Sequence, residues 1–304
     1  MQMTRRRTFL PAGVASTTAA GAGSRVALVL ACGFLGLAFV LGGGSRSDIA
    51  SLTILRPLAA LTLVAGLVLL EGWQWRAWRL ELGLFAAMLV LVVGQLVPLP
   101  PEVWQALPGR DLHRAIDEAA GNGEIWRPLS LQPAATRNAL WALATPFAMV
   151  VLMARAGPGR SGALLPVVLL IGAVNAALSL LQVIGDPRGP MYFYAVTNHG
   201  EAVGLFANRN HNAAFMACMF PLLAVWWSGG LDRAARQAGK PLPSILEPRS
   251  LVILSCAILC LVLILIIGSR TGIAVAMVAI ALSLAMLQFA APGGAGRPVS
   301  GPAG

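Results

Sequence analysis

Arginine, histidine and asparagine gather in one short segment of a chain that is otherwise strongly apolar. The segment reads GLFANRNHNAAFMACMFP and begins at Gly204, just where a long apolar run starts. Unpaired polar side chains are costly in hydrocarbon, so a dense group of them at the edge of a membrane span indicates a polar ligand or an inward-facing cavity. A second polar junction, Gly268–Gly272 (GSRTG), separates two later apolar stretches.

The residue types at these two junctions are suited to binding an anion. Arg209 and Arg270 each offer a planar guanidinium, whose fork grips phosphate or diphosphate better than an ammonium group does. Each arginine lies at the expected start of a helix, where free N–H groups and the helix dipole also favour negative charge. His211 could accept a proton, donate a hydrogen bond to a phosphate or cap the helix. The candidate catalytic residue is His211, and the candidate substrate-binding residues are Arg209, Arg270, Asn208, Asn210, Asn212 and Ser269.

Ordinary structural roles are the alternatives for the same residues. Asn210 could cap the helix of the first junction, and Ser269 or Thr271 could cap the helix of the second. Either arginine could simply anchor a helix end by extending to the level of the lipid headgroups. Residues 208, 211 and 212 share one helix face if the helix begins early enough, and this grouping favours the ligand-binding interpretation.

Composition places the chain among membrane proteins. Hydrophobic residues make up 57% of it and charged residues only 11%, with a mean hydropathy of +0.76. These values exclude a soluble domain. The apolar runs are continuous and contain Gly and Ala, which is typical of packed membrane helices and unlike the alternating strands of a membrane barrel. We therefore predict an all-α polytopic protein with about eight transmembrane helices. The predicted spans are 26–42, 52–70, 80–99, 138–154, 163–184, 211–228, 250–268 and 272–289.

The distribution of basic residues predicts the orientation and the domain organisation. Most Lys and Arg residues fall on segments that share a side of the membrane with the N-terminus, which indicates a cytoplasmic N-terminus. Both polar junctions then face the outer side. Residues 1–25 form a cytoplasmic tail and 26–290 a membrane domain, with a longer outer loop at 100–137 between the third and fourth spans. Residues 291–304, rich in Gly, Pro and Ala, form a disordered tail or a truncated loop, which predicts that the chain is a fragment.

Two further polar features lie within the predicted spans. Asn175, Ser179 and Gln182 recur at i, i+4 and i+7 and form a polar stripe, which either lines a cavity or bonds to a neighbouring helix. Arg56 lies about one turn inside the outer end of the second span, just before Pro57. It either reaches the interface or holds a ligand in a buried position.

Several other functions find little support in the sequence. The four cysteines all fall within predicted spans, where they behave as small apolar residues, so no disulfide or metal site is expected. Twenty-two Lys and Arg residues outnumber twelve acidic ones, but they are scattered over both sides of the membrane, which excludes a nucleic-acid interface. In the outer loop, acid/base or metal chemistry and a solvated polar helix are the alternatives for Asp111, His113, Asp117 and Glu118.

Taken together, four short segments resemble the O-antigen ligase and polymerase-like family of bacterial inner-membrane proteins. The similarity covers most of residues 80–290, and the first segment is the most specific. The segments are GLFANRNH at 204–211, YFY at 192–194, SRTG at 269–272, and WRPLS at 126–130 with Pro133 and Thr136.

This resemblance implies a glycosyltransferase of lipopolysaccharide or polysaccharide biosynthesis. Such an enzyme takes a glycan from undecaprenyl diphosphate at the periplasmic face and joins it to lipid A core sugar, a growing polysaccharide or, in some members, a protein. It needs no metal and no cofactor, and its outer-face arginines hold the diphosphate of the donor, which here points to Arg209 and Arg270. The expected partners are the lipid-linked donor, the acceptor and membrane lipids, without nucleic acid.

The chain departs from the family pattern in one respect. Members usually continue through further spans and a large outer loop, whose histidine is proposed to activate the acceptor hydroxyl. Either the chain is an N-terminal fragment and catalysis needs the remainder, or His211 takes a role that the sequence does not assign. The alternative function is a transporter or flippase of lipid-linked sugars, with the polar stripe as its path. A membrane scaffold is a third interpretation, and it predicts that the outer arginines tolerate substitution.

Overall fold

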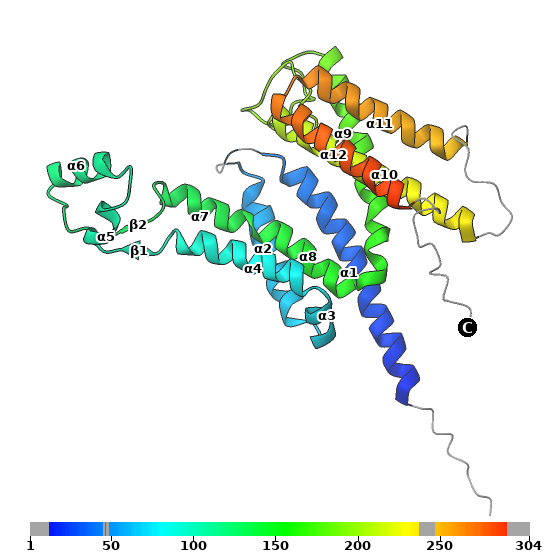
Figure 1. The fold of residues 1–304 in the computed structure, drawn as a ribbon, viewed down its shortest axis with the longest axis horizontal. Helices are drawn as coiled ribbons and strands as arrows, with labels where there is room; N and C mark the ends of the chain where they lie inside the picture. Colours follow the sequence, from blue (N-terminus) through cyan, green and yellow to red (C-terminus); the bar gives the residue numbers. More distant parts are fainter. Residues whose placement is uncertain (1–11, 45, 47–48, 237–246, 291–304) are drawn as a thin grey trace, which may run out of the picture. The chain divides into compact units, whose positions relative to one another are not determined.

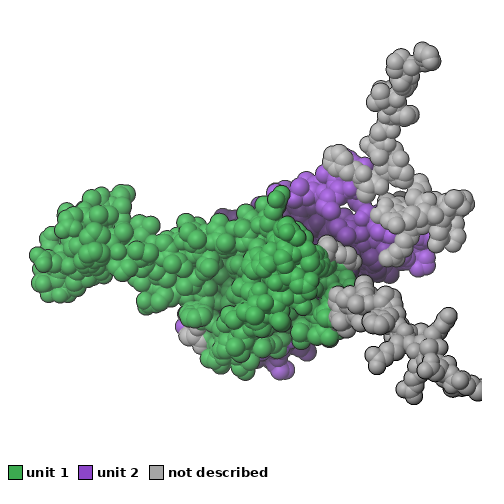
Figure 2. Space-filling model, turned by 90° about the horizontal axis from the view of Figure 1, so that it is seen from below, with its two compact units in different colours: residues 1–38, 47–161 green, residues 39–46, 162–304 purple. Residues whose placement is uncertain are grey.

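The computed structural model describes residues 12–44, 46, 49–236 and 247–290. Within these residues nearly every element is a helix (Figure 1). Six stretches in the described part are long and apolar enough to cross a membrane, so the chain is a polytopic helical membrane protein. It folds into two compact units, residues 1–38 with 47–161 and residues 39–46 with 162–304 (Figure 2).

Each of the eight predicted spans contains a helix, six of them fall within the long apolar stretches, and short elements lie between them. The helices are α1 (Ala12–Leu41), α2 (Leu52–Val68), α3 (Gly72–Ala77), α4 (Arg79–Gly94), α5 (Pro101–Gln105), α6 (Asp111–Ala119), α7 (Pro133–Ala142), α8 (Ala144–Ala156), α9 (Leu165–Ile184), α10 (Arg209–Arg236), α11 (Pro248–Ile267) and α12 (Arg270–Ala290). A 3-10 segment spans Pro158–Leu164, and the strands β1 (Pro98–Leu99) and β2 (Arg127–Pro128) pair antiparallel.

Several helix ends differ from the predicted ones, for local reasons. Helix α1 begins at Ala12, well before the predicted start at residue 26. The Ala-rich stretch that follows Ala12 is only weakly apolar, but alanine favours helix formation. Helix α4 ends at Gly94, ahead of the prolines at 98 and 100. The fourth predicted span is interrupted at Leu143, because Pro146 has no N–H to donate to the carbonyl four residues earlier. The tail predicted at 1–25 is helical from Ala12 onward, and its residues 1–11, like the tail predicted at 291–304, lie outside the described residues.

In the first unit, α2 and α8 form the main helix pair. Gly66 on α2 lies against Val151 on α8, so closely that a side chain at position 66 would collide with the valine. At the start of α3 the side chains and backbone groups of Glu71 and Gln74 cap one another, and Arg155 of α8 donates to both side chains. These contacts tie α3 to the C-terminal end of α8.

The segment between α4 and α7 folds into a small structured lobe, which we call the loop lobe (residues 98–130). At its centre Trp104 is fully buried, and its indole N–H donates to the carbonyl of Ile125 over 2.9 Å. Arg127 pairs with Asp117 through both carboxylate oxygens and lies over the Trp104 ring, with 5.8 Å from its guanidinium carbon to the ring centroid. The alternative of a solvated polar helix therefore does not hold for Asp117, because Arg127 holds it inside the lobe.

The Asp117–Arg127 pair predicts an acid-sensitive loop lobe. The hydrogen bonds from Arg127 hold the pKa of the Asp117 carboxyl below its usual range, although burial opposes the shift. A lowered folded-state pKa gives stability that is present above about pH 4 and is lost as the pH falls through the lowered value. We expect Asp117→Asn to reduce amide hydrogen-exchange protection in the loop lobe at pH 7. The difference from wild type should disappear at strongly acid pH.

The neighbouring exposed acid provides the control for this experiment. Asp111→Asn removes a carboxylate of which 89% of the side-chain surface is accessible, and its partner Arg114 lies 3.6 Å away at the surface. Surface pairs of this kind contribute little to stability. Equal loss of protection in the two variants would contradict a specific role for the buried pair.

The second unit is a bundle of α9, α10, α11 and α12 with its own apolar core. Helix α10 packs against the other three, most extensively against α12 (Figure 1). Met216 of α10 and Leu263 of α11 are both fully buried in this core, together with Ala276 of α12. The opposite faces of these helices leave large apolar side chains exposed, such as Leu265 and Met277, as expected of surfaces that meet lipid.

Candidate functional site

The structure starts α10 and α12 at the two arginines that the sequence singled out. Helix α10 begins at Arg209, and the side-chain oxygen of Asn208 accepts the backbone N–H of Asn210 over 2.8 Å. Asn208, and not Asn210, is thus the residue that turns the chain into this helix. Helix α12 begins at Arg270, and the hydroxyl of Ser269 accepts the N–H of Gly272 over 3.0 Å, which is the capping role that the sequence left open as an alternative for Ser269 or Thr271.

The two helix starts lie side by side. Gly272, in the first turn of α12, is so close to Ala213, the fifth residue of α10, that a side chain on the glycine would overlap the alanine methyl group. Ala213 also belongs to a small buried cluster with Ala202 and Ile267, the last residue of α11. Arg209 and Arg270 therefore lie at the same end of the bundle, and the positive ends of two helix dipoles meet there.

Beneath this end lies a network of buried side-chain amides. Asn212 donates from its amide to the hydroxyl of Ser179 over 2.9 Å and to the carbonyl of Ala202 over 2.8 Å. Its side-chain oxygen accepts a bond of 2.6 Å from the amide of Asn175. These three polar side chains are 0% exposed. The polar stripe of α9 therefore bonds to a neighbouring helix, which is one of the two alternatives that the sequence left open.

The same stripe fixes the segment that connects α9 to α10, which we call the connecting loop (residues 185–208). Gln182 binds both backbone groups of Gly204, accepting from its N–H over 2.7 Å and donating to its carbonyl over 3.0 Å. Asn175 accepts the N–H of Leu205 over 2.7 Å. Gly204 has a φ of +58°, and a side chain there would collide with the Asn175 amide, so the position requires glycine.

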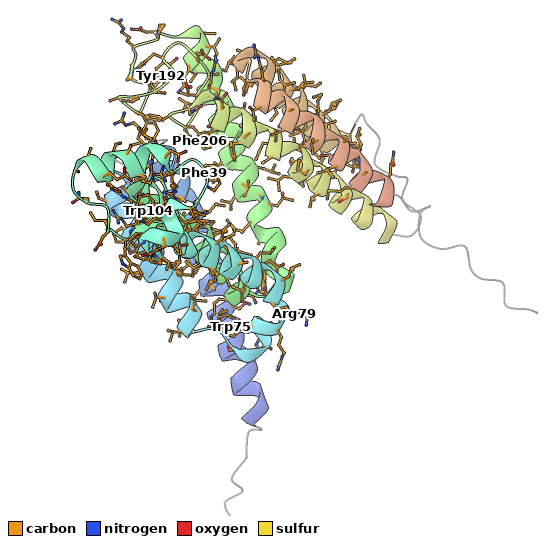
Figure 3. All side chains as sticks on the ribbon, turned by 60° about the vertical axis from the view of Figure 1, so that its left-hand side comes forward. Phe39, Trp75, Arg79, Trp104, Tyr192 and Phe206 are labelled. Carbon is orange, nitrogen blue, oxygen red and sulfur yellow. The ribbon has the colours of Figure 1, made fainter. Side chains whose placement is uncertain are left out.

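Aromatic residues hold the remainder of the connecting loop. The hydroxyl of Tyr192 lies 3.2 Å from the carbonyl oxygens of both Gln182 and Glu201. Phe206 packs edge-on against Phe39 at the end of α1, with ring centroids 6.4 Å apart (Figure 3). Both contacts hold the connecting loop that leads to Arg209.

Arg209 is paired with an acid that the sequence did not identify as a site residue. Its Nη1 lies 2.6 Å from one carboxylate oxygen of Glu201 and 2.5 Å from the other, and its backbone N–H donates to the side chain of Asn198 over 3.1 Å. Within the described residues, the structure shows hydrogen bonds from this guanidinium through Nη1 alone. Glu201 thus orients Arg209 and leaves the Nε and Nη2 donors for a ligand. The only sequence signal for this pair is the position of Glu201 eight residues before the arginine.

Apart from Asn208, which is half-buried at the start of α10, the predicted site residues divide into those that are open to solvent and those that are buried. His211, Asn210 and Arg270 are exposed, and Arg209 is half-buried beside Glu201. Asn212 and Ser269 are buried, and their polar atoms bond to the protein. The first group can meet a ligand, whereas the second supports the helix starts. Asn212 and His211 therefore do not face the same surroundings, because α10 begins at Arg209 and turns residue 212 into the bundle.

An exposed cluster of guanidinium, imidazole and amide groups at paired helix starts can bind an anion and can accept a proton from a nearby hydroxyl. Among the described residues, no group of three His, Cys, Asp or Glu side chains is arranged to hold a metal ion. No protein-family model, curated protein or solved structure matches the chain. The chemistry of the site is therefore inferred from its own residues.

Proposed function

We propose that this chain is an O-antigen ligase-like glycosyltransferase. It transfers a glycan from undecaprenyl diphosphate to lipid A core sugar or to a polysaccharide acceptor. The observation that supports this most strongly is the meeting of two helix starts, each with an arginine as its first residue. Two helix dipoles and two guanidinium groups at one end of a bundle suit a diphosphate, which carries more than one negative charge.

The topology that goes with this function has eight transmembrane helices. The N-terminus is cytoplasmic, and the connecting loop, the loop lobe and both helix starts are at the periplasmic face of the inner membrane. In addition to the six long stretches, α2 with 17 residues and α4 with 16 complete the eight spans. At a rise of about 1.5 Å per residue these two helices are about 24–26 Å long, a few ångströms less than the hydrocarbon layer, so in this topology the apolar residues beyond their ends complete the crossing.

The reaction breaks the bond between the sugar and the diphosphate and forms a bond from the sugar to an acceptor oxygen. Negative charge develops on the departing diphosphate, where Arg209, Arg270 and the helix N–H groups stabilise it. The acceptor hydroxyl loses its proton, and His211, which is exposed beside Arg209, is the base that this chain offers. The scheme needs no nucleotide.

Transport of lipid-linked sugars is the competing function, and the buried amide network argues against it. A translocation path would need the polar stripe of α9 to face an open channel. Instead Asn175, Ser179 and Gln182 are buried and bind Asn212 and the connecting loop. The stripe therefore positions the outer site, which suits an enzyme better than a transporter.

Substitution of Arg270 tests the proposed function. We expect Arg270→Ala to lower glycan transfer at least about tenfold, because it removes one of the two cations from the leaving group, although the exposed charge is partly screened by water. Transfer is measured as the amount of capped lipopolysaccharide or polymer on a gel. In the variant, the unused lipid-linked donor should accumulate on the periplasmic leaflet. Unchanged transfer, or donor stranded on the cytoplasmic leaflet, would refute the enzymatic function.

A further inference from the structure

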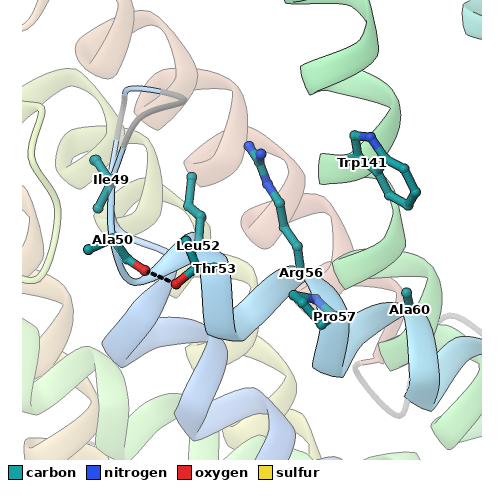
Figure 4. Close-up of a pocket in the computed structure, with 8 residues that line it drawn as sticks. All are labelled: Ile49, Ala50, Leu52, Thr53, Arg56, Pro57, Ala60 and Trp141. Atoms are coloured by element: carbon teal, nitrogen blue, oxygen red, sulfur yellow. Dashed lines mark hydrogen bonds between the residues drawn. The ribbon is translucent and has the colours of Figure 1, made fainter.

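The first unit contains a second candidate site, formed by residues 49–60 and Trp141. A hollow of about 580 Å³ opens beside the first turns of α2 (Figure 4). Its walls are mostly apolar, with Leu52, Pro57 and Ala60 from α2 and the indole of Trp141 from α7. Arg56 is the one cation that lines it, and no Asp or Glu of the described residues does.

The guanidinium of Arg56 is incompletely satisfied by the protein. Its Nη2 donates to the side-chain oxygen of Asn138, which is neutral and leaves the positive charge of the arginine uncompensated. Its Nε is buried and has no hydrogen-bond partner. A buried N–H without a partner carries a desolvation penalty, which a bound water, ion or ligand can relieve.

The surroundings of the hollow indicate an amphiphilic ligand. On the adjoining face of α2, Ile54, Leu58 and Leu61 leave large apolar side chains exposed, and this face is suited to an acyl chain. Trp141 has 56% of its surface exposed, and tryptophan with an apolar body and a polar N–H is typical of the headgroup level of a membrane.

We propose that the hollow at Arg56 binds one anionic phospholipid, whose phosphodiester accepts hydrogen bonds from the guanidinium while an acyl chain lies along α2. A phosphodiester carries a single negative charge and matches the single arginine. A polyprenyl diphosphate carries at least two negative charges and would leave one of them unpaired beside apolar walls. The site is independent of the proposed glycan transfer and persists if that function is wrong.

The experiment is a titration of the delipidated, purified full chain with phosphatidylglycerol, in which native mass spectrometry measures the bound lipid. We expect Arg56→Gln to weaken the first binding step at least about tenfold, because the charge-assisted hydrogen bonds are lost. Arg137→Gln is the matched control, since it removes the same charge from an exposed position one residue before Asn138 on α7. The control should bind phosphatidylglycerol as wild type does.

A second variant blocks the hollow without removing the arginine. Ala60→Phe fills the space between α2 and Trp141 and keeps the Arg56–Asn138 hydrogen bond, so it tests the site even if Arg56→Gln fails to fold. It should weaken phosphatidylglycerol binding by a comparable factor. Dioleoylglycerol, which lacks the phosphate, should bind wild type at least about tenfold more weakly than phosphatidylglycerol.

Three results would overturn the proposal. The first is equal phosphatidylglycerol binding by wild type and either Arg56→Gln or Ala60→Phe. The second is tighter binding of undecaprenyl phosphate than of phosphatidylglycerol, which would assign the hollow to a polyprenyl lipid. The third is complete displacement of phosphatidylglycerol by an equimolar amount of inorganic phosphate, which would show that the apolar walls contribute nothing.

Discussion

Replacing Arg209 with alanine is expected to lower the rate of glycan transfer by about 10²- to 10³-fold, the usual effect of removing one preorganised charge-stabilising group. Arg209 is the first residue of α10, and Glu201 and the connecting loop hold its guanidinium in place. The guanidinium is therefore already in position to stabilise the departing diphosphate before the donor binds. The measurement is the transfer rate in membranes supplied with lipid-linked donor, with protein amount and insertion checked in parallel.

Two matched variants separate this role from a general effect of charge. Arg188→Ala removes an exposed arginine from the same connecting loop and should leave transfer near the wild-type rate. Glu201→Gln keeps the arginine but weakens the contact that orients it, so the KM for the donor should rise more than kcat falls. If Arg188→Ala and Arg209→Ala lower transfer equally, the effect is one of overall surface charge, and the proposed donor site is wrong.

The helical, membrane-spanning character of the chain could be predicted from composition and from the lengths of the apolar runs. Helix ends were less predictable where local signals compete. The Ala-rich stretch after Ala12 is too weakly hydrophobic to register as a span, yet it is a good helix former. Pro146 divides one predicted span into α7 and α8. A proline within an apolar run is a known helix breaker, so this interruption could have been predicted from the sequence.

The candidate site was predictable in its location and less so in its contacts. Spacing alone placed Asn175, Ser179 and Gln182 on one helix face, but it could not show that Asn212 and Gly204 are their partners. Such pairs join residues that are distant in sequence, and the fold alone brings them together. The same holds for Asp117 and Arg127, whose buried pair cannot be inferred from a stretch that looks like a polar surface helix.

The second large effect is expected from Asn212→Leu, which should lower the stability of the second unit by about 3 kcal/mol or more. Leucine has a similar volume, but it removes three hydrogen bonds and leaves the amide of Asn175 and the carbonyl of Ala202 buried without that partner. Such unsatisfied groups carry their full desolvation cost. The measurement is the melting temperature of the detergent-solubilised full chain, monitored by fluorescence-detected size-exclusion chromatography.

The control for this prediction lies two residues away on the same helix. Asn210→Leu makes the same chemical change at an exposed position, where only the backbone N–H of residue 210 is bonded to Asn208, and the melting temperature should hardly change. Because Asn212 also helps to hold the connecting loop that leads to Arg209, Asn212→Leu should reduce donor binding even below its melting temperature. A variant that melts like wild type would show that the amide network adds no net stability and does not position the outer site.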